Sequence, residues 1–600
     1  MASRPGASSG WMRDGRWHGW AVLAFAAAVF LGTVYSPPSL LDDVDSTYAQ
    51  IARSMLDSGD WITARLNGVA YFDKPPGQVW AIGLSYALFG VHDWAARLPM
   101  ALAAMALCWL AWRTGRWAFG DQAGLYAGIG LAACLGLFLF TRARMPDIYV
   151  ACSSLLALDC FLRAQEGSLR GARARMALAG ATVGIGLLCK GLVAAALPLG
   201  AIGTYLVVSG DWRSRESWRR LGLPGAVAAA TLVAAPWHVL SIARHPPYLE
   251  FGLNSGPGQY HGFFWRYFVN EHVLRFLGLR YPVDYNRVPM LWFWAGHLAW
   301  LFPWSGLIPA VRELRFRVAG RAARTRMLML CCCGFTLLFF SASTSQEYYT
   351  LPAYAPAMLL LASAAASLPH RLRAACRVAG GVYAAALVAG IGVLLAGRHV
   401  TVSGDISSAL VSNPEAYTLA LGHFRDLTLG SFAYLRGPLA LAVAACAIGA
   451  LGGCLLAQRR AAATLACATL LVLHAAHWAM ATFDPYLSSR PLAEAYLRAP
   501  PGEMILDHEY YAFSSVAFYT NRPVLLLNGR KNNIEYGSNA PGAPDVFLND
   551  EDLAALWQGE RRVYLATYGG DRGRFEELLG AGRVHLMVES GGKILLSNGR

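Results

Sequence analysis

The sequence predicts a mostly helical protein that crosses a membrane many times. Of its 600 residues, 56% are hydrophobic and only 15% are charged, whereas a soluble domain carries about 25% charged residues. The mean hydropathy is +0.37, and apolar runs of about 20 residues, long enough to cross a bilayer as helices, recur along most of the chain. We therefore expect a polytopic membrane protein, in which the net charge of +14 reflects membrane topology and not nucleic-acid binding.

Thirteen apolar segments are predicted to span the membrane. They lie near residues 19–36, 97–112, 121–141, 146–164, 175–189, 190–208, 221–242, 289–310, 326–343, 349–367, 374–396, 437–457 and 463–482. Arginines gather in alternate connecting segments, and the positive-inside rule places those segments in the cytoplasm. The N-terminus is then cytoplasmic, and the tail from residue 483 is periplasmic. The apolar stretch 79–90 is too short to span and is interpreted as an interfacial helix; if it crossed, every later loop would change sides.

The chain changes character near residue 483. The stretches "VLLLN", "RRVYLATY", "VHLMVES" and "KILLSN" predict short strands, and "DEDLAALW" and "RFEELLG" predict helices. None of the twelve cysteines lies in this tail, and their spacing elsewhere indicates neither a disulfide framework nor a zinc finger. We predict a transmembrane domain over residues 1–482, with outward loops 37–96 and 243–288, followed by a soluble α/β domain over residues 483–600.

Three acids open the first outward loop, directly after the first span. Asp42, Asp43 and Asp45 precede "STYAQIARSMLDSG", which predicts a helix capped by Ser46 or Asp45 and ended by Gly59. A carboxylate at a membrane edge can act as a general base or orient an acceptor; the alternative is a helix cap in solvent. Further on, "YFDKPPG" places Asp73 and Lys74 at the same boundary, where the lysine could bind a phosphate or extend to the lipid headgroups.

The second outward loop carries a basic excess on the side where the topology rule disfavours it. In "YFVNEHVLRF", Glu271 and Arg275 are spaced to share one face of a helix, either as an ordinary ion pair or as part of an anion site. Glu271 and His272 could also be two metal ligands. Further outward-facing candidates are Arg142, Asp147, Lys190, Gln346, Glu347, Tyr348 and Tyr349. For the tyrosines the alternative is the aromatic belt of the membrane interface.

The motifs, taken in order, resemble a known enzyme family. They are the first loop, "DSTYAQIARSMLDSGDWITARLNGVAYFDKPPGQVWAIGLSYALFG", and then "RARMPD", "CKG", "APWHV", "YFVNEHVLRF", "FPW" and "QEYYTLPAYAP". Together these stretches are similar to the bacterial lipid A aminoarabinose transferases. These belong to a wider group of integral-membrane sugar transferases that includes the dolichyl-phosphate-mannose–protein mannosyltransferases. The resemblance covers about residues 19–370, and the departure "VDSTY", where that branch usually reads "DE-x-R-Y", keeps acceptors besides lipid A open.

The resemblance implies a C-type glycosyltransferase fold with about thirteen spans and a polyprenyl-phosphate-linked sugar as donor. By position, Asp45 or Asp43 corresponds to the catalytic acid, and Lys74, Arg275 and Tyr349 correspond to groups that hold the donor phosphate. Asp73 and His272 correspond to a place where the aminoarabinose branch can carry a metal such as zinc.

We therefore expect a glycosyltransferase of the bacterial inner membrane that works at the periplasmic face. Its partners would be an undecaprenyl-phosphate-linked donor, a lipid or glycan acceptor such as lipid A, and membrane lipids, and it would act as a monomer with no required cofactor. A polyprenyl-sugar transporter or flippase is the alternative. It would need intramembrane acids or inverted repeats with broken helices, and the sequence shows neither.

Overall fold

The computed structural model describes residues 16–142, 145–282, 287–317, 320–411 and 421–599. Within these ranges nine helical segments are long and apolar enough to cross a membrane, which confirms the predicted multi-span architecture. The segments are Trp17–Tyr35 (α1, Arg16–Phe30, with α2, Gly32–Tyr35), α5 (Asp93–Phe119), α9 (Leu169–Lys190), Arg215–Arg244 (α11, Arg215–Leu221, with α12, Leu223–Arg244), α17 (Arg321–Ala342), Glu347–Ser367 (η5, Glu347–Ala353, with α18, Tyr354–Ser367), α19 (Pro369–Ala396), α21 (Arg436–Leu455) and α22 (Gln458–Thr482).

The other four predicted spans take different forms, so the count of thirteen stays a prediction. Residues 121–141 form α6 (Asp121–Ala132) and α7 (Leu135–Phe140), and the predicted spans 146–164 and 190–208 correspond to α8 (Asp147–Ala164) and α10 (Val193–Ser209). The prediction of one helix over 289–310 is wrong. Three short helices replace it, and Pro303, which has no N–H with which to continue a helical ladder, lies between the last two of them. They are α15 (Met290–Ala295), α16 (His297–Trp300) and the 3-10 helix η4 (Ser305–Glu313).

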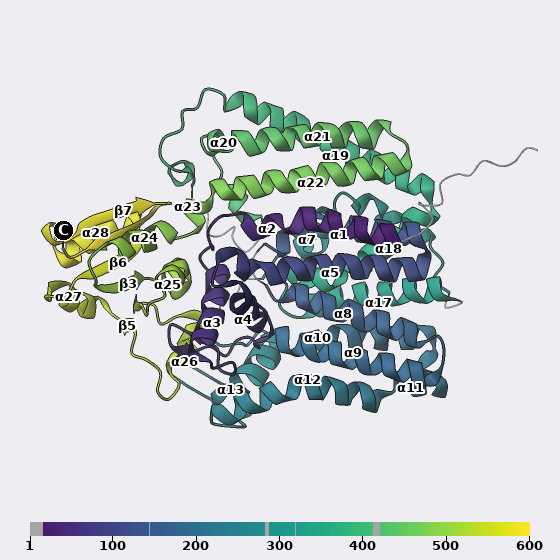
Figure 1. Cartoon of the computed structure of the whole chain (residues 1–600), viewed down its shortest axis with the longest axis horizontal. Coiled ribbons are helices and arrows are strands. Elements are labelled where there is room, and N and C mark those ends of the chain that lie inside the picture. The colour runs from purple at the N-terminus through teal and green to yellow at the C-terminus, as the bar shows by residue number, and fades with distance from the viewer. Residues whose placement is uncertain (1–15, 143–144, 283–286, 318–319, 412–420, 600) are drawn as a thin grey trace, which may run out of the picture.

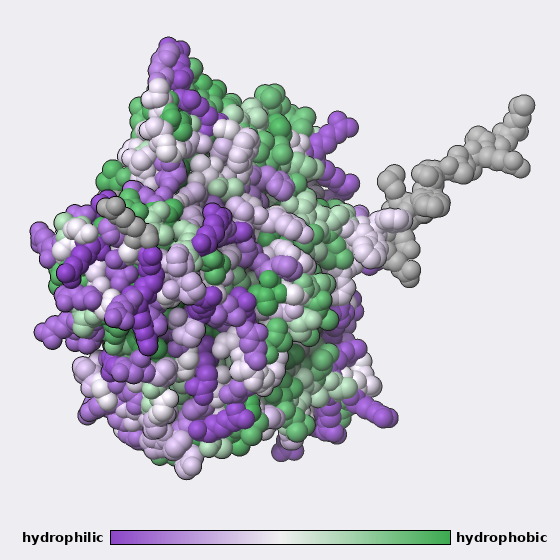
Figure 2. All heavy atoms as spheres, turned by 60° about the vertical axis from the view of Figure 1, so that its left-hand side comes forward, coloured by the Kyte–Doolittle hydropathy of each residue, from purple (hydrophilic) through white to green (hydrophobic). Residues whose placement is uncertain are grey.

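The helices lie roughly side by side in one bundle, and the tail sits at one end of it (Figure 1). The arginine-bearing α11 lies at the opposite end of the bundle from the tail. Hydrophobic side chains gather in a band over the bundle, between the more hydrophilic tail and a hydrophilic far rim (Figure 2). Many of these side chains are exposed, with Leu291 84% and Leu232 76% accessible, as expected of a surface whose solvent is lipid.

The two loops that the sequence predicts to face outward fold between the bundle and the tail. The first contains α3 (Val44–Ser58), the hairpin of β1 (Arg65–Leu66) and β2 (Val69–Ala70), and α4 (Gly77–Phe89), which is the helix predicted over 79–90. Helix α3 ends at Gly59 in the left-handed conformation, as predicted, but it begins two residues early, with Asp43 at its N-cap and no side-chain cap bond. The second loop contains α13 (Gly262–Phe264), a π-helix η3 (Trp265–Leu274) and α14 (Arg275–Leu277).

The tail contains a six-stranded sheet in the order β5-β4-β3-β6-β8-β7. Strands β3 (Glu503–Asp507), β4 (Leu525–Leu527), β5 (Phe547–Leu548) and β6 (Val563–Tyr568) are parallel, and β7 (His585–Ser590) and β8 (Lys593–Ser597) join them antiparallel. The helices are α24 (Arg490–Arg498), α25 (Ser514–Thr520), α26 (Asn532–Ser538), α27 (Asp550–Gln558) and α28 (Arg572–Leu579). The predicted strands and helices are present; β3 and β5 were not predicted.

The remaining short helices connect these elements. They are η2 (Asp211–Arg213), η6 (Ile406–Ala409), η8 (Gly422–Asp426), α20 (Ser431–Tyr434), α23 (Asp484–Leu487), η9 (Tyr510–Phe513), η10 (Gly569–Asp571) and η11 (Ala581–Arg583).

The two faces of the tail sheet pack into different cores. Along β3, Ile505 faces α27 and α28, whereas Met504 and Leu506 face the other way, as the two-residue period of a strand requires. The second face shares a core with Ile51 and Met55 of α3. One continuous apolar core therefore joins the first loop to the tail, while the predicted domain boundary at residue 482 stays a prediction.

Candidate active site

Asp43 lies where the first span enters the first loop, in a backbone conformation that is unusual for a residue with a side chain. Its φ is 70° and its ψ is −136°, a region that costs about 1–3 kcal/mol and recurs at functional sites. The tail holds it there, because the Asp43 amide donates to the Tyr511 carbonyl and to Ser514 Oγ, both at 2.9 Å.

Asp43 as a whole residue is exposed, yet the protein around its carboxyl group disfavours the charged form. Desolvation, followed by the negative charges of Glu509, Asp42 and Asp45, raises the pKa of Asp43 to about 7. A reachable carboxyl group that titrates near neutrality suits a general base, since it is partly ionised at working pH and still binds a proton well.

Asp45, the other predicted catalytic acid, has a structural environment instead. Its side chain is 3% exposed, and its Oδ2 accepts from the Leu41 amide at 3.1 Å and from Arg97 Nη2 at 3.2 Å. Arg97 also donates to the carbonyls of Pro37 and Ser39. Asp45 and Arg97 thus fix the backbone just before Asp43, and which acid acts in catalysis stays a prediction.

The third acid of the cluster fastens the loop to the tail. Asp42 Oδ2 accepts from Lys593 Nζ and Ser489 Oγ, both at 2.6 Å, and its Oδ1 accepts from the Ser515 amide at 2.8 Å. Lys593 is 5% exposed. These contacts engage both carboxylate oxygens of Asp42 in binding the tail. Asp43 is then the exposed acid of the cluster.

Two of the three predicted phosphate-binding residues, Lys74 and Arg275, contact one carboxylate, and the third, Tyr349, joins them through Arg275. Lys74 Nζ lies 3.5 Å from Glu271 Oε2, and Arg275 Nη1 donates to the same oxygen at 2.9 Å. The other Arg275 nitrogen, Nη2, donates to the Tyr349 hydroxyl at 2.8 Å. Burial opposes ionisation of Glu271, but Arg280, Lys74 and Arg275 outweigh it and hold its pKa well below the ordinary value, so this carboxylate is ionised and orders the cations around it.

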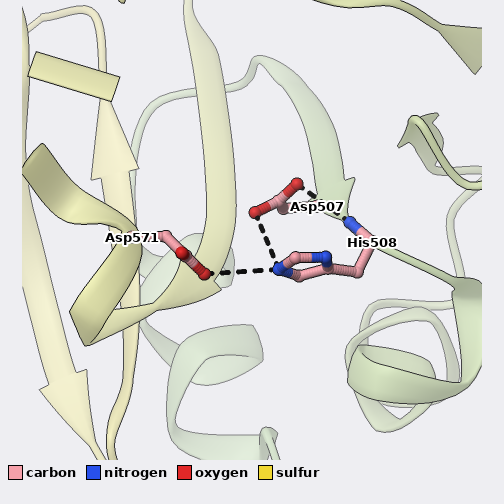
Figure 3. Close-up of side chains that lie close together, drawn as sticks. All are labelled: Asp507, His508 and Asp571. Carbon is pink, nitrogen blue, oxygen red and sulfur yellow. Dashed lines mark hydrogen bonds and ion pairs between the residues drawn. The ribbon is translucent and has the colours of Figure 1, made fainter. Parts of the chain in front are cut away.

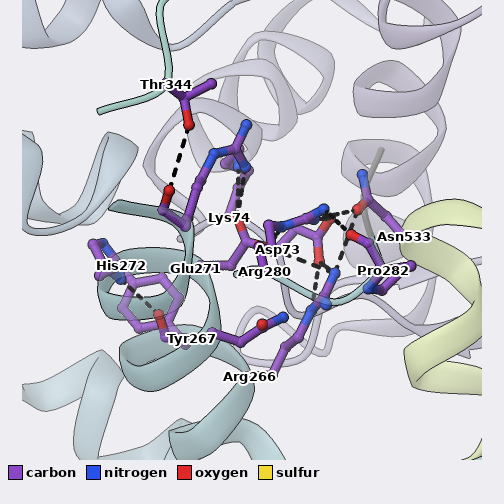
Figure 4. Close-up of polar contacts among 12 residues, drawn as sticks. Asp73, Lys74, Arg266, Tyr267, Glu271, His272, Arg280, Pro282, Thr344 and Asn533 are labelled. Atoms are coloured by element: carbon purple, nitrogen blue, oxygen red, sulfur yellow. Dashed lines mark hydrogen bonds and ion pairs between the residues drawn. The ribbon is translucent and has the colours of Figure 1, made fainter. Parts of the chain in front are cut away.

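A second carboxylate, Asp73, lies deeper in the same group (Figure 4). Arg266 donates to Asp73 Oδ1 from Nη2 at 2.6 Å and from Nε at 3.0 Å, and Arg280 Nη2 lies 3.5 Å from Asp73 Oδ2. Asn533, on α26 of the tail, accepts from both arginines, at 3.3 Å and 2.6 Å. Both guanidinium groups are fully buried, so two loops and the tail meet in one polar network.

Cations outnumber carboxylates among the residues that the structure describes in this network. The cations are Lys74, Arg266, Arg275 and Arg280, and the carboxylates are Asp73 and Glu271. The group is largely buried, so its charges interact more strongly than they would in water. A phosphate group has the charge and the acceptor oxygens to bind to such a concentration of cations.

Two tyrosines place Asp43 and the basic network beside the same region. Burial raises the pKa of Tyr48 and of Tyr511 above the ordinary value, and the charges of Asp73 and Asp43 both add to it. Each hydroxyl therefore lies within electrostatic reach of both carboxylates. The candidate acid and the candidate phosphate site border one location.

The other predicted candidates divide between this site and structural contacts. Asp147 pairs with Lys190, whose ammonium lies 4.3 Å from the Tyr349 ring centre, so this ion pair borders the site. Glu347 is buried and accepts from Trp292 Nε1. The remaining two have local roles: Gln346 is the N-cap residue of η5, and the Arg142 guanidinium lies over the Phe138 ring at 5.3 Å.

His272, the predicted metal partner of Asp73, has both ring nitrogens in contact with backbone. Nδ1 lies 2.6 Å from the Tyr267 carbonyl, and Nε2 lies 3.0 Å from the Leu192 amide, from which it accepts. Burial lowers the pKa of His272 to about 4, so the ring is neutral. Asp73 meanwhile faces arginines. A metal held by this pair stays a prediction that these contacts do not favour.

Arg266 and Arg280 belong to the basic excess of the second loop, but the sequence indicates no individual role for them, and it gives no role to Arg97 or Asn533. The excess itself was a usable signal for the two arginines. Nothing local marks Asn533, because its partners lie 253 and 267 residues away in the chain. The π-helix η3 was also missed, although such helices recur at functional sites.

Comparison with known proteins gives consistent results. Residues 73–239 match the family described as dolichyl-phosphate-mannose-protein mannosyltransferase. An undecaprenyl phosphate-α-4-amino-4-deoxy-L-arabinose arabinosyl transferase of Aeromonas salmonicida is 27% identical over 556 residues, 90% of this chain and 92% of that protein. A Pseudomonas aeruginosa protein of the same name is 30% identical over 361 residues, 59% and 60% of the two chains.

A solved structure shows the same fold. ArnT from Cupriavidus metallidurans, determined bound to undecaprenyl phosphate, superimposes with a TM-score of 0.76 and 21% identity, covering 99% of both chains. Its ligand-free structure gives a TM-score of 0.74. The predicted C-type glycosyltransferase fold is therefore confirmed.

Proposed function

We propose that the chain is an integral-membrane glycosyltransferase like the aminoarabinose transferases, and that it moves a sugar from an undecaprenyl-phosphate carrier to a cell-envelope acceptor, with lipid A as the first acceptor to test. The observation that carries this proposal is the gathering of Lys74, Arg275 and Arg280 around Glu271, in loops that also contain the acid Asp43.

The basic network is suited to a departing phosphate. When the bond between the sugar and the carrier phosphate breaks, negative charge builds on the phosphate oxygens. Lys74 and Arg275 lie on the solvent-accessible side of the network, 26% and 19% exposed, so they would contact that phosphate, and the Tyr349 hydroxyl would add a hydrogen bond. Fixed charges of this kind lower the barrier because they need no reorganisation during the reaction. We propose that these cations suffice and that no metal is required.

Asp43 supplies the other half of the chemistry. Its carboxylate would orient the incoming acceptor and take a proton where the acceptor carries one. If the acceptor is itself a phosphate oxygen, as on lipid A, no proton need be removed and Asp43 would act by orientation. Asp45 would support it indirectly, by holding the preceding backbone through Arg97.

The arrangement across the membrane follows from the same site. We propose an inner-membrane protein with a cytoplasmic N-terminus and a periplasmic tail, acting as a monomer. In support, arginine-bearing α11 and the tail lie at opposite ends of the bundle (Figure 1), as the positive-inside rule requires. The donor sugar is proposed to be an aminoarabinose, since that sugar is part of the relatives' names.

The test is transfer by the purified full-length protein in lipid vesicles, given undecaprenyl-phosphate-linked aminoarabinose and lipid A. Mass spectrometry should show lipid A gaining one sugar and free undecaprenyl phosphate accumulating in equal amount. Labelled donor that crosses the bilayer with its sugar still attached, and no modified acceptor of any class, would instead favour the transporter. In cells, the deletion strain should lack the sugar on one class of envelope molecule.

A further inference from the structure

The tail contains a second polar cluster, separate from the basic network. In the parallel part of the sheet the chain runs from β3 outward through β4 and β5, and then returns to β6 on the other side of β3. The carboxyl ends of β3 and β6 therefore form a topological switch point, the place where open α/β sheets bind ligands. Asp507 ends β3, His508 follows it, and Asp571 comes three residues after β6.

These three side chains point toward one another (Figure 3). His508 Nε2 lies 3.3 Å from Asp507 Oδ2 and 3.3 Å from Asp571 Oδ2, and one ligand atom from each residue lies within 4.8 Å of the other two. Asp507 is buried, whereas His508 and Asp571 are half-exposed. The cluster is thus rigid on one side and reachable from solvent on the other.

The spacing is that of metal ligands and is too long for strong ionic hydrogen bonds. A charged N–H···O bond between histidine and carboxylate is typically about 2.7–2.9 Å long. A tetrahedral zinc ion, with bonds of about 2.0–2.1 Å, holds neighbouring ligand atoms about 3.3–3.4 Å apart. Both measured separations match that tetrahedral edge, on the one histidine nitrogen that faces both acids.

The groups around Asp507 also fit a metal ligand. Thr567 Oγ1 donates to Asp507 Oδ2 at 2.7 Å, the His508 amide donates to Oδ1 at 2.9 Å, and Arg574 Nη1 lies 3.7 Å from Oδ1. Carboxylates that bind metals are usually oriented by such outer contacts. Since the arginine is on the Oδ1 side, Oδ2 is the oxygen left facing His508 and Asp571.

We propose that Asp507, His508 and Asp571 bind a divalent cation of the zinc class. Two carboxylates and one neutral imidazole balance its charge and supply three ligands, and the half-exposed side keeps a further position for water or an anionic oxygen. The cation would also brace the segment after β3, in which Tyr511 and Ser514 hold the Asp43 backbone. This site does not depend on the proposed sugar transfer.

The test measures zinc binding to the purified full-length protein in detergent, after removal of metals with a chelator. Calorimetric titration with zinc chloride should show one tight site per chain. His508→Gln and Asp571→Asn should each weaken it by more than about 100-fold, since even outer contacts are worth about 10- to 100-fold. The half-exposed Asp571 makes Asp571→Asn the variant that leaves the sheet core intact.

The matched control is His423→Gln, which removes an exposed histidine outside the cluster, one whose Nδ1 lies 3.0 Å from Asp426. It should bind zinc as the natural protein does. Cobalt should give the absorption bands of a tetrahedral site in the natural protein and lose them in Asp571→Asn. Two results would overturn the proposal: Asp571→Asn binds zinc as tightly as the natural protein, or the natural protein binds zinc no more tightly than His508→Gln. Either result would show that the three residues form only a hydrogen-bonded cluster.

Discussion

Burial, followed by the negative charges of neighbouring acids, raises the pKa of Asp43 to about 7, so its role can be read from a pH profile. If its ionised form orients or deprotonates the acceptor, kcat/KM should rise with pH and reach half its maximum at a pH of about 7. Glu509 supplies the largest of the repulsive charges. Glu509→Gln should therefore lower the pKa of Asp43 and move the midpoint to lower pH, measured with the purified enzyme at saturating acceptor.

Two controls separate this effect from a general change in charge. Glu577→Gln removes an exposed acid of α28 and should leave the midpoint where it is. Asp43→Asn should lose most activity while Asp45→Asn loses stability first, because Asp45 is the partner of the buried Arg97. A midpoint that does not move in Glu509→Gln would contradict the assignment to Asp43.

Lys74 is the most exposed cation of the basic network, and its removal tests the phosphate site. Lys74→Ala should lower kcat/KM by about 100- to 1000-fold, the usual cost of losing one positioned group that stabilises transition-state charge. Arg572→Ala, an exposed cation of α28 paired only within its helix, is the control and should keep normal activity. Near-normal transfer by Lys74→Ala would remove this residue from the mechanism.

The sequence could name the acids and cations of the site but could not rank them. Lys74, Arg275 and Tyr349 were predicted as one group, and the structure brings Lys74 and Arg275 together on Glu271, with Tyr349 bound to Arg275. Asp43 and Asp45 could not be distinguished, because what separates them is Arg97 on one side and Tyr511 of the tail on the other. Both contacts depend on tertiary structure.

At the scale of elements, the π-helix η3 holds the second loop against the first. It carries Arg266, whose guanidinium is fully buried against Asp73. Asp73→Asn would leave this charge poorly compensated, and breaking a buried pair in this way costs about 3–5 kcal/mol. We expect a clear fall in the Tm of the detergent-solubilised protein, together with lost activity.

The matched control for Asp73→Asn is Asp57→Asn, which breaks the half-exposed pair of Asp57 with Arg53. Surface pairs contribute about 0–1 kcal/mol, so its Tm should hardly change. Equal Tm values for the two variants would mean that the buried network is not what joins the two loops.

Hydropathy predicts elements well where one physical requirement dominates. Nine predicted spans became long apolar helices, since a bilayer demands both length and apolarity. The segment 289–310 met those demands in composition, yet Pro303 interrupts it. Strand β3 was missed because "EMILD" is too short for its periodicity to stand out, and η3 because the sequence gives no signal that distinguishes a π-helix from an α-helix.

At the scale of the whole molecule, the tail is part of the site and not an appendage. It holds the Asp43 backbone, supplies Asn533 to the basic network and clamps Asp42 through Lys593, 551 residues away in the chain. The sequence predicted four of the strands and two of the helices of this tail but could not predict its docking, because the contacts join segments that are hundreds of residues apart.

The orientation of the whole chain is a prediction that labelling can decide. If chemistry takes place at the periplasmic face, the tail must be periplasmic and α11 cytoplasmic.

Glu577→Cys and Arg215→Cys place a thiol at exposed positions in α28 and α11, in a background where the exposed Cys454 and Cys467 are serine. A membrane-impermeant maleimide, given to cells with a permeabilised outer membrane, should label Glu577→Cys at once and Arg215→Cys only after the inner membrane is broken. Both should react fully in detergent. The opposite order would place Lys74 and Asp43 on the cytoplasmic side, because the tail and the first loop share one core, and the proposed periplasmic transfer would then be wrong.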